Sequence, residues 1–195
     1  MIAERPRPMM TPAEYFIWEE QQDLRYEYID GEVYGMTGGS LAHSGIGVNI
    51  VAIFRAHLRG SQCRVFNSDG KVGISTEGPF TYPDISVTCD DRDKTAQNYI
   101  AYPTLIIEIL SPGTEGYDRG GKFALYRQLS SLKEYGLISS TSIAIDIFGL
   151  NLAGKWELSS YGSGDEVQFI TLDLTLPIEQ VYEDLNVAPG RARSR

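Results

Sequence analysis

A single carboxylate, Glu108, interrupts an otherwise apolar run, Thr104-Leu-Ile-Ile-Glu-Ile-Leu110. Such a run is typical of a central β-strand that is covered on both faces. A lone carboxylate buried there costs several kcal/mol or becomes protonated, so Glu108 must meet a cation, a set of hydrogen-bond donors or water near the strand end. Because strand side chains alternate, Glu108 shares a face with Ile106 and Leu110.

Three other charged residues occupy the beginnings or ends of predicted elements. Asp84 opens the predicted strand Tyr82–Cys89, and Glu27 lies in a predicted hairpin strand. Lys122 lies in the first turn of a predicted helix, four residues after Asp118, where a positive charge opposes the helix dipole. Each has a simpler interpretation: a turn residue, a solvent-facing glutamate, an i,i+4 ion pair. Taken together, the carboxylates are of the ligand type that a hard divalent cation prefers, and the lysine can stabilise developing negative charge.

The elements that must position these residues show alternating helical and strand patterns. Thr11-Pro12-Ala13-Glu14 predicts a helix start with a capping box, and the helix should reach about Gln22. Asp30-Gly31 predicts a hairpin over 25–34. Further predictions are helices at 46–58, from about 122 and at 177–185, and strands at 64–67, 71–76, 82–89, 104–110, 134–139, 143–148, 155–161 and 166–172.

These elements predict an α/β (mixed α+β) domain, a mixed β-sheet flanked by helices. Strands 64–67 and 71–76 should pair around Asp69-Gly70, and strands 155–161 and 166–172 around 162–164. Residues 111–121, which contain four glycines and Pro112, are interpreted as a mobile loop.

Composition favours one soluble globular domain. The chain has 195 residues, of which 42% are apolar and 22% charged. We expect flexible ends at 1–10 and 186–195 and a single domain over 11–185. Cys63 and Cys89 fit neither a disulfide framework nor a metal-binding spacing, so free, partly buried thiols are expected. The sequence has no apolar run suited to a signal peptide or a membrane span, and a cytoplasmic protein without membrane contact is expected.

The ordered set of motifs resembles the Uma-two family of restriction-endonuclease-like proteins. The resemblance covers about residues 11–185, and each motif alone is weak. The motifs are Arg25-x-Glu27-x-x-Asp30-Gly31, His43, Tyr82-Pro83-Asp84-x-x-Val87, Pro103-x-Leu-Ile-Ile-Glu108-x-x-Ser111-Pro112, Tyr117-Asp118-x-x-x-Lys122-x-x-x-Tyr126 and Glu134-Tyr135-x-Leu137-Ile138. The family in turn is similar to the PD-(D/E)XK nucleases, whose core is a mixed sheet between helices.

The resemblance implies a site. Asp84 and Glu108 match the two acidic half-motifs, and Glu27 resembles an additional upstream carboxylate. The superfamily usually has lysine two positions after the second acidic residue, where this chain has Leu110, so Lys122 is the expected replacement. Asp84, Glu108, Glu27 and the Ile109 carbonyl are the expected ligands of Mg²⁺, for which Mn²⁺ can substitute. His43, Asp118 and Tyr126 are expected to line the site.

Charge argues against tight DNA binding. Residues 11–185 contain 12 basic and 25 acidic residues, a net charge of −13, whereas phosphate backbones are bound mainly by lysine and arginine. We therefore expect weak, local DNA contact, with Lys71, Arg92, Lys94, Arg119 and Lys122 in segments that could border the cleft. A homodimer would place two sites on one duplex. The alternatives are a nuclease-fold module with little cutting activity, for binding or regulation, and a phosphodiesterase acting on a small substrate.

Overall fold

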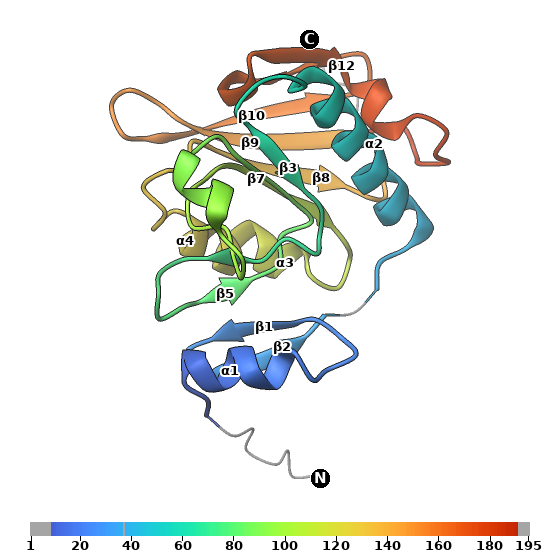
Figure 1. The fold of residues 1–195 in the computed structure, drawn as a ribbon. Helices are drawn as coiled ribbons and strands as arrows, with labels where there is room; N and C mark the ends of the chain where they lie inside the picture. The colour runs from blue at the N-terminus through green and yellow to red at the C-terminus, as the bar shows by residue number, and fades with distance from the viewer. Residues whose placement is uncertain (1–8, 37, 191–195) are drawn as a thin grey trace, which may run out of the picture.

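A computed structural model describes residues 9–36 and 38–190, and Figure 1 shows their fold. The helices are α1 (Pro12–Glu19), α2 (Leu41–His57), α3 (Glu115–Tyr117) and α4 (Phe123–Tyr126), with a π-helical turn η2 (Asp118–Lys122) between the last two. Short 3-10 turns are η1 (Asp91–Thr95), η3 (Ile170–Leu172) and η4 (Ile178–Tyr182). Thr37 and the ends at 1–8 and 191–195 lie outside this description, as does most of the two predicted flexible ends.

A six-stranded mixed sheet forms the centre, in the order β10-β9-β8-β7-β6-β3. Its strands are β3 (Arg64–Phe66), β6 (Ile85–Thr88), β7 (Pro103–Leu110), β8 (Glu134–Ser139), β9 (Ala144–Leu150) and β10 (Trp156–Gly162). Strands β7 and β8 are parallel and the other neighbours are antiparallel. The predicted fold class, a mixed sheet flanked by helices, is confirmed.

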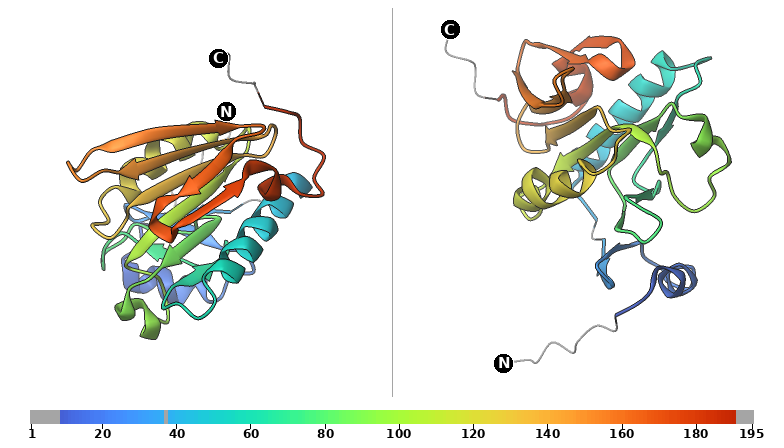
Figure 2. Two further views of the ribbon diagram at one scale, coloured as in Figure 1. Left: turned by 90° about the horizontal axis from the view of Figure 1, so that it is seen from above. Right: turned by 90° about the vertical axis from the view of Figure 1, so that its left-hand side faces the viewer.

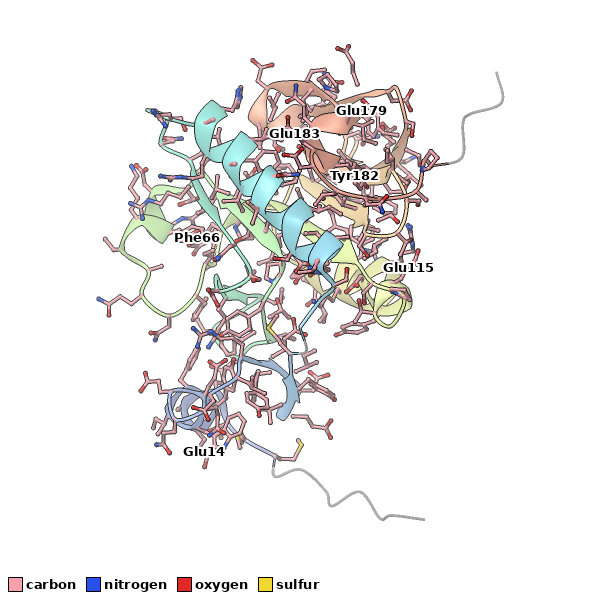
Figure 3. The ribbon with its side chains drawn as sticks, turned by 90° about the vertical axis from the view of Figure 1, so that its right-hand side faces the viewer. Glu14, Phe66, Glu115, Glu179, Tyr182 and Glu183 are labelled. Atoms are coloured by element: carbon pink, nitrogen blue, oxygen red, sulfur yellow. A yellow bond between two sulfur atoms is a disulfide. The ribbon has the colours of Figure 1, made fainter. Side chains whose placement is uncertain are left out.

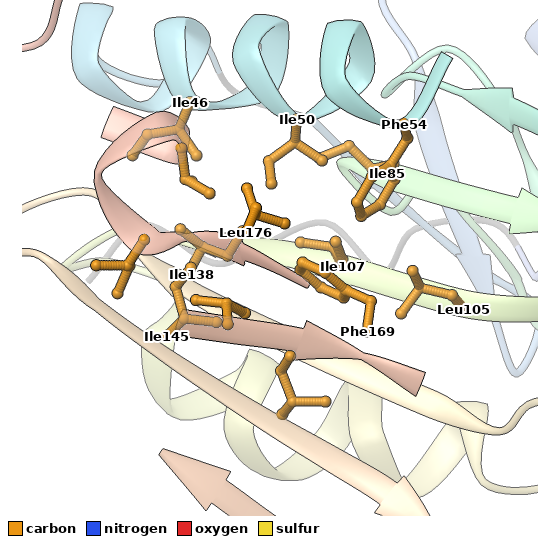
Figure 4. Packing of buried hydrophobic residues seen from close by; sticks show 14 of the residues in the cluster. Ile46, Ile50, Phe54, Ile85, Leu105, Ile107, Ile138, Ile145, Phe169 and Leu176 are labelled. Atoms are coloured by element: carbon orange, nitrogen blue, oxygen red, sulfur yellow. The ribbon is translucent and has the colours of Figure 1, made fainter. Parts of the chain in front are cut away.

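Both faces of this sheet are covered, as the apolar run of β7 predicts. On one face α2 lies over the sheet, and its Ile46, Ile50 and Phe54 are fully buried against residues such as Ile107 (Figure 4). The hairpin of β11 (Glu166–Phe169) and β12 (Leu174–Pro177) completes that layer together with η4. The other face is covered by α4 and the residues that follow it, which pack on Ile106 and Leu110.

A second, four-stranded sheet, β2-β1-β5-β4, lies beneath the first and carries the N-terminal residues (Figure 1). Its strands are β1 (Tyr26–Ile29), β2 (Glu32–Gly35), β4 (Val72–Gly73) and β5 (Phe80–Thr81). The predicted hairpin is confirmed, since Asp30 and Gly31 adopt positive φ between β1 and β2. The capping box of Thr11 with Glu14 is confirmed as well. We call α1, β1 and β2 the N-terminal unit; Figure 2 shows it from two further directions.

Two predicted hairpins are wrong. Strand β3 pairs with β6 and β4 pairs with β5, so Asp69-Gly70 links two different sheets. Likewise β10 pairs with β9 and β11 pairs with β12, so residues 162–164 connect two strands that do not pair with each other. A turn signal marks a change of direction, but the hydrophobic surfaces of the finished fold decide which strands become partners.

Three other predictions need correction. The expected mobile loop at 111–121 contains α3 and most of η2, so Lys122 lies inside a continuous helical stretch, at the end of η2 and directly before α4, rather than in the first turn of a helix. The closing helix predicted at 177–185 is the 3-10 turn η4. Cys63 and Cys89 are not free thiols; they form a disulfide. They sit just outside the last aligned pair of β3 and β6, Arg64 and Thr88, and this cross-strand pairing cannot be inferred from spacing along the chain.

Candidate active site

The predicted site residues meet at the edge of the main sheet where β6 begins and β7 ends. A cavity of about 480 Å³ lies there. Of the eight residues predicted for the site, seven line the cavity: Glu27, His43, Asp84, Glu108, Ile109, Asp118 and Lys122. Tyr126 lies behind it and contacts the site through a hydrogen bond.

Lys122 stands at the centre of the acidic residues. Its Nζ lies 3.1 Å from Glu108 Oε1, 3.2 Å from Glu27 Oε1 and 3.9 Å from Asp118 Oδ1. The lysine comes from η2, Glu108 from β7 and Glu27 from β1, so three separate elements meet at one ammonium group. Burial on its own would lower the pKa of Lys122, but attraction by these carboxylates outweighs it and raises that pKa, which keeps the lysine charged.

Glu108 is almost fully buried, with 3% of its surface exposed. Its Oε1 accepts a hydrogen bond of 2.9 Å from the Tyr126 hydroxyl in addition to its contact with Lys122. Burial raises the pKa of Glu108 to about 8; Lys122 opposes that rise, and the charges of Asp84, Asp118 and Glu27 add to it. Of the alternatives that the sequence leaves open for this carboxylate, the structure shows a cation, Lys122, together with a hydrogen-bond donor, Tyr126.

Asp84 is held by the neighbouring strand. Its Oδ2 accepts a 2.7 Å hydrogen bond from the backbone N–H of Ile109, which ties the start of β6 to the end of β7. Its Oδ1 lies 3.4 Å from Nε2 of His43, in the first turn of α2. Contact with Asp84 raises the pKa of His43. Asp84 therefore has one oxygen anchored by backbone and the other facing an imidazole at the cavity wall.

Glu27 and Asp118 are positioned by groups that sequence reasoning did not assign. Glu27 Oε1 accepts a 3.1 Å hydrogen bond from the backbone N–H of Tyr82, and the Tyr135 hydroxyl donates to the Asp118 carbonyl at 2.8 Å. Burial raises the pKa of Asp118. Tyr82 directly precedes the Pro83-Asp84 motif, so its place in the motif was visible in the sequence, but a backbone N–H leaves no signature in residue type.

Four of the five cations expected near the cleft are occupied elsewhere. Lys71 is buried and paired with Glu19, close to the rings of Tyr15 and Phe16. Arg92 pairs with Asp90, Lys94 with Asp91, and Arg119 with Glu115 and Asp146. Of the five, Lys122 alone lines the cavity. The segment of Arg119 does border the cavity, through Asp118 and Lys122, but the side chains of the other four cations are not on its wall and are paired with carboxylates.

The donor set suits a hard cation, although the observed arrangement is not a finished metal site. Magnesium prefers carboxylate and carbonyl oxygens, and Glu27, Asp84 and Glu108 supply carboxylates around one cavity. Among residues 9–36 and 38–190, no three acidic, histidine or cysteine side chains are already arranged to hold a metal ion. The Lys122 ammonium supplies the positive charge between Glu27 and Glu108 in this arrangement.

The fold and the site together define a class of protein: a mixed-sheet domain of the restriction-endonuclease type with acidic residues and one lysine at a strand end. The model of the family described as "Putative restriction endonuclease", Uma2, matches residues 12–188. The chain belongs to the Uma2 family, and the predicted resemblance is confirmed.

Among the described residues, no helix has the length and apolar character that crossing a membrane requires.

Two relatives and one solved structure are similar to this chain over most of its length. An uncharacterized protein of Synechocystis sp. is 43% identical over 188 residues, spanning 95% of this chain and 99% of that protein. A second from the same organism is 29% identical over 172 residues, 87% of this chain and 97% of its own. The crystal structure of a "putative nuclease belonging to DUF820" from Anabaena variabilis has a TM-score of 0.72 and 19% identity, covering 88% of this chain and 97% of that one. At that identity the likeness establishes the fold.

Proposed function

We propose that this protein is a magnesium-dependent endonuclease that hydrolyses phosphodiester bonds in DNA, with Mn²⁺ able to replace Mg²⁺. The observation that carries the proposal is the convergence of Glu27, Asp84 and Glu108 with the charged Lys122 in one cavity. Family membership supports nuclease chemistry at that place. Asp84, Glu108 and Glu27, with the Ile109 carbonyl, would hold the ion.

When bound, the ion supplies hydroxide at neutral pH and offsets the charge that develops on the phosphate. Lys122 orients the attacking water and stabilises the negative charge of the transition state, because its ammonium is buried and fixed by surrounding carboxylates. Tyr126 fixes the orientation of Glu108 through its hydroxyl, and His43 together with the Ile109 N–H fixes Asp84. Closely spaced carboxylates that repel one another without an ion should also make the protein more stable in its presence.

The second candidate is a nuclease-fold module that binds without cutting. Two observations favour it: no three-residue metal group is preformed among the described residues, and Lys122 already neutralises Glu27 and Glu108. The two candidates differ in one measurable respect, since only the enzyme converts its substrate when Mg²⁺ is added.

Plasmid nicking tests the proposal. Supercoiled DNA should become open circles with wild-type protein in millimolar Mg²⁺ or Mn²⁺, and Asp84→Ala should abolish the conversion. Asp91→Ala is the matched control, because that aspartate is 72% exposed and lies outside the cavity. A wild-type protein that nicks no DNA in either metal, or an Asp84→Ala variant as active as wild type, would contradict the enzyme assignment.

A further inference from the structure

Acidic residues are distributed unevenly along this chain. None of the 26 acidic residues lies between Glu32 and Asp69, although the whole chain has a net charge of −9. The same stretch contains both histidines of the chain and three arginines, Arg55, Arg59 and Arg64. It includes α2 and β3, so an element that packs on the main sheet is basic in an otherwise acidic protein.

A groove runs from the candidate active site along this basic helix. It has a volume of about 570 Å³, and His43, Asp84 and Ile109 belong to both its wall and the wall of the catalytic cavity. We call it the α2 groove. The helix contributes a stripe of residues at four-residue spacing, and side chains so spaced lie on one face. The stripe consists of His43, Gly47, Val51 and Arg55, with Ser44, Val48 and Ala52 beside it.

The helix is covered on its other side. Asn49 donates hydrogen bonds of 3.1 Å and 3.0 Å to the carbonyls of Val181 and Glu183, which ties that side to η4. Figure 3 shows α2 between η4, marked by Tyr182 and Glu183, and the strand that carries Phe66. The α2 groove lies toward the Phe66 side, where Asn67 and Ser68 complete its wall.

The arginines at the far end of the α2 groove are available for a ligand. Arg55 and Arg59 are exposed, and within the described part of the chain neither forms an ion pair with a carboxylate within 4 Å. Arg55 also borders a neighbouring hollow of about 200 Å³ that Arg59 lines. By contrast, Arg92 and Arg119 are each paired with acidic side chains.

We propose that the α2 groove holds the sugar–phosphate backbone of the DNA strand beside the scissile phosphate, and that Arg55 and Arg59 bind its phosphates. The inference rests on the proposed function and identifies the surface on which the substrate lies. From His43 to Arg55 the helix rises about 18 Å at 1.5 Å per residue, which is long enough to lie along several nucleotides of one strand. Gly47 and Ala52 leave room for a backbone between these ends.

Equilibrium binding tests the two arginines. Labelled duplex DNA is titrated with full-length Asp84→Ala protein in Ca²⁺, with and without the further pair Arg55→Gln and Arg59→Gln. Each lost phosphate contact reduces the slope of log K against log salt by about 0.9, which at 0.1 M salt weakens binding about eightfold per arginine. Arg127→Gln, an exposed arginine that lies over Phe123 on the opposite face of the sheet, should change neither quantity.

A chemical cross-link tests the path. Both native cysteines are joined in the disulfide, so an introduced cysteine is the one free thiol. Val48→Cys, at a position 65% exposed beside the groove stripe, should undergo thiol–disulfide exchange with DNA that carries an activated mixed disulfide on a phosphate tether near the cleavage point, so that the activating thiol leaves and a protein–DNA disulfide forms. Leu152→Cys, in the exposed turn between β9 and β10, should not.

The outcomes separate this inference from the proposed function. Wild-type cutting combined with unchanged affinity and salt slope in the double arginine variant would overturn the α2 groove and leave the endonuclease standing. Arginine-dependent DNA binding without any cutting would support the groove and refute the enzyme. Equal cross-linking at Val48 and Leu152, or competition by polyglutamate as strong as that by DNA, would also overturn the groove as a DNA-binding surface.

Discussion

Replacing Lys122 with methionine removes the positive charge around which the site is built. The side chain keeps most of its length and apolar stem, so the change is mainly electrostatic. Glu108 and Glu27 lose an ammonium at 3.1 Å and 3.2 Å, and Asp118 loses one at 3.9 Å. These three residues are buried, so water replaces the lost partner only in part. We expect the variant to be markedly less stable and unable to cut DNA.

Removal of one partner from a buried ion pair typically costs about 3–5 kcal/mol. In this site the cost should depend on pH, because Glu108 can take up a proton. Its pKa of about 8 already includes a lowering by Lys122, so in the variant that pKa rises further. Protonated Glu108 needs no cation, and the loss should be near 3 kcal/mol at pH 6. As pH rises above the raised pKa, the carboxylate ionises without a partner and the loss should approach 5 kcal/mol.

Urea denaturation at pH 6 and pH 9 measures this loss as the difference in free energy of unfolding. Lys155→Met is the matched control, since Lys155 is exposed near the β9–β10 turn and should change stability by no more than about 0.5 kcal/mol. Adding Glu108→Gln to the Lys122→Met variant should recover part of the loss, because the unpaired charge is gone. A cost below about 1 kcal/mol at both pH values would show that Lys122 does not neutralise these carboxylates.

Three other predictions concern neighbouring features. Millimolar Mg²⁺ should raise the thermal unfolding midpoint more at pH 8.5 than at pH 6, because Glu108, with a pKa of about 8, must lose its proton before it binds an ion. The Glu108→Gln variant should show no such difference, and equal shifts at both pH values in the wild type would contradict the prediction. Tyr126→Phe should cost about 1 kcal/mol in urea denaturation, since Lys122 still contacts the Glu108 oxygen that loses the hydroxyl. No change, measured beside a Tyr161→Phe control on β10, would argue against the hydrogen bond. Replacing both Cys63 and Cys89 with alanine should lower the free energy of unfolding by about 3 kcal/mol, because the disulfide joins residues 26 positions apart, and plasmid nicking should continue. A double variant as stable as oxidised wild type would mean that the disulfide contributes nothing to stability.

The members of the candidate site could be predicted because its residues violate local rules. Glu108 breaks an apolar strand, and such a break has few physical solutions, one of which is the cation that Lys122 provides. The position of Lys122 itself came from a motif, and the structure adds the reason it reaches the site, which is the π-helical turn η2. Residue type and order therefore predicted the members of the site, whereas the backbone groups of Tyr82 and Ile109 that orient them have no signature in sequence.

Strand partners were harder to predict than strands. Most predicted strands exist, but Asp69-Gly70 and the turn at 162–164 connect strands that pair with others. Pairing across a turn is a local preference of a fraction of a kcal/mol to about 1 kcal/mol per residue pair, and burial of a whole strand face outweighs it. The disulfide was missed for a related reason, since it depends on β3 lying beside β6.

Glu27 comes from the N-terminal unit, whose hydrophobic core of Tyr15, Tyr28 and Val33, completed by Phe80 of β5, is separate from the two cores of the main sheet. Local opening of that unit would withdraw one carboxylate while the main sheet stays folded. Amide hydrogen exchange in β1 should therefore slow when a ligand engages Glu27, even though exchange in β7 stays limited by global unfolding. The time for which the N-terminal unit stays closed would therefore set how long all the carboxylates of the candidate site are together.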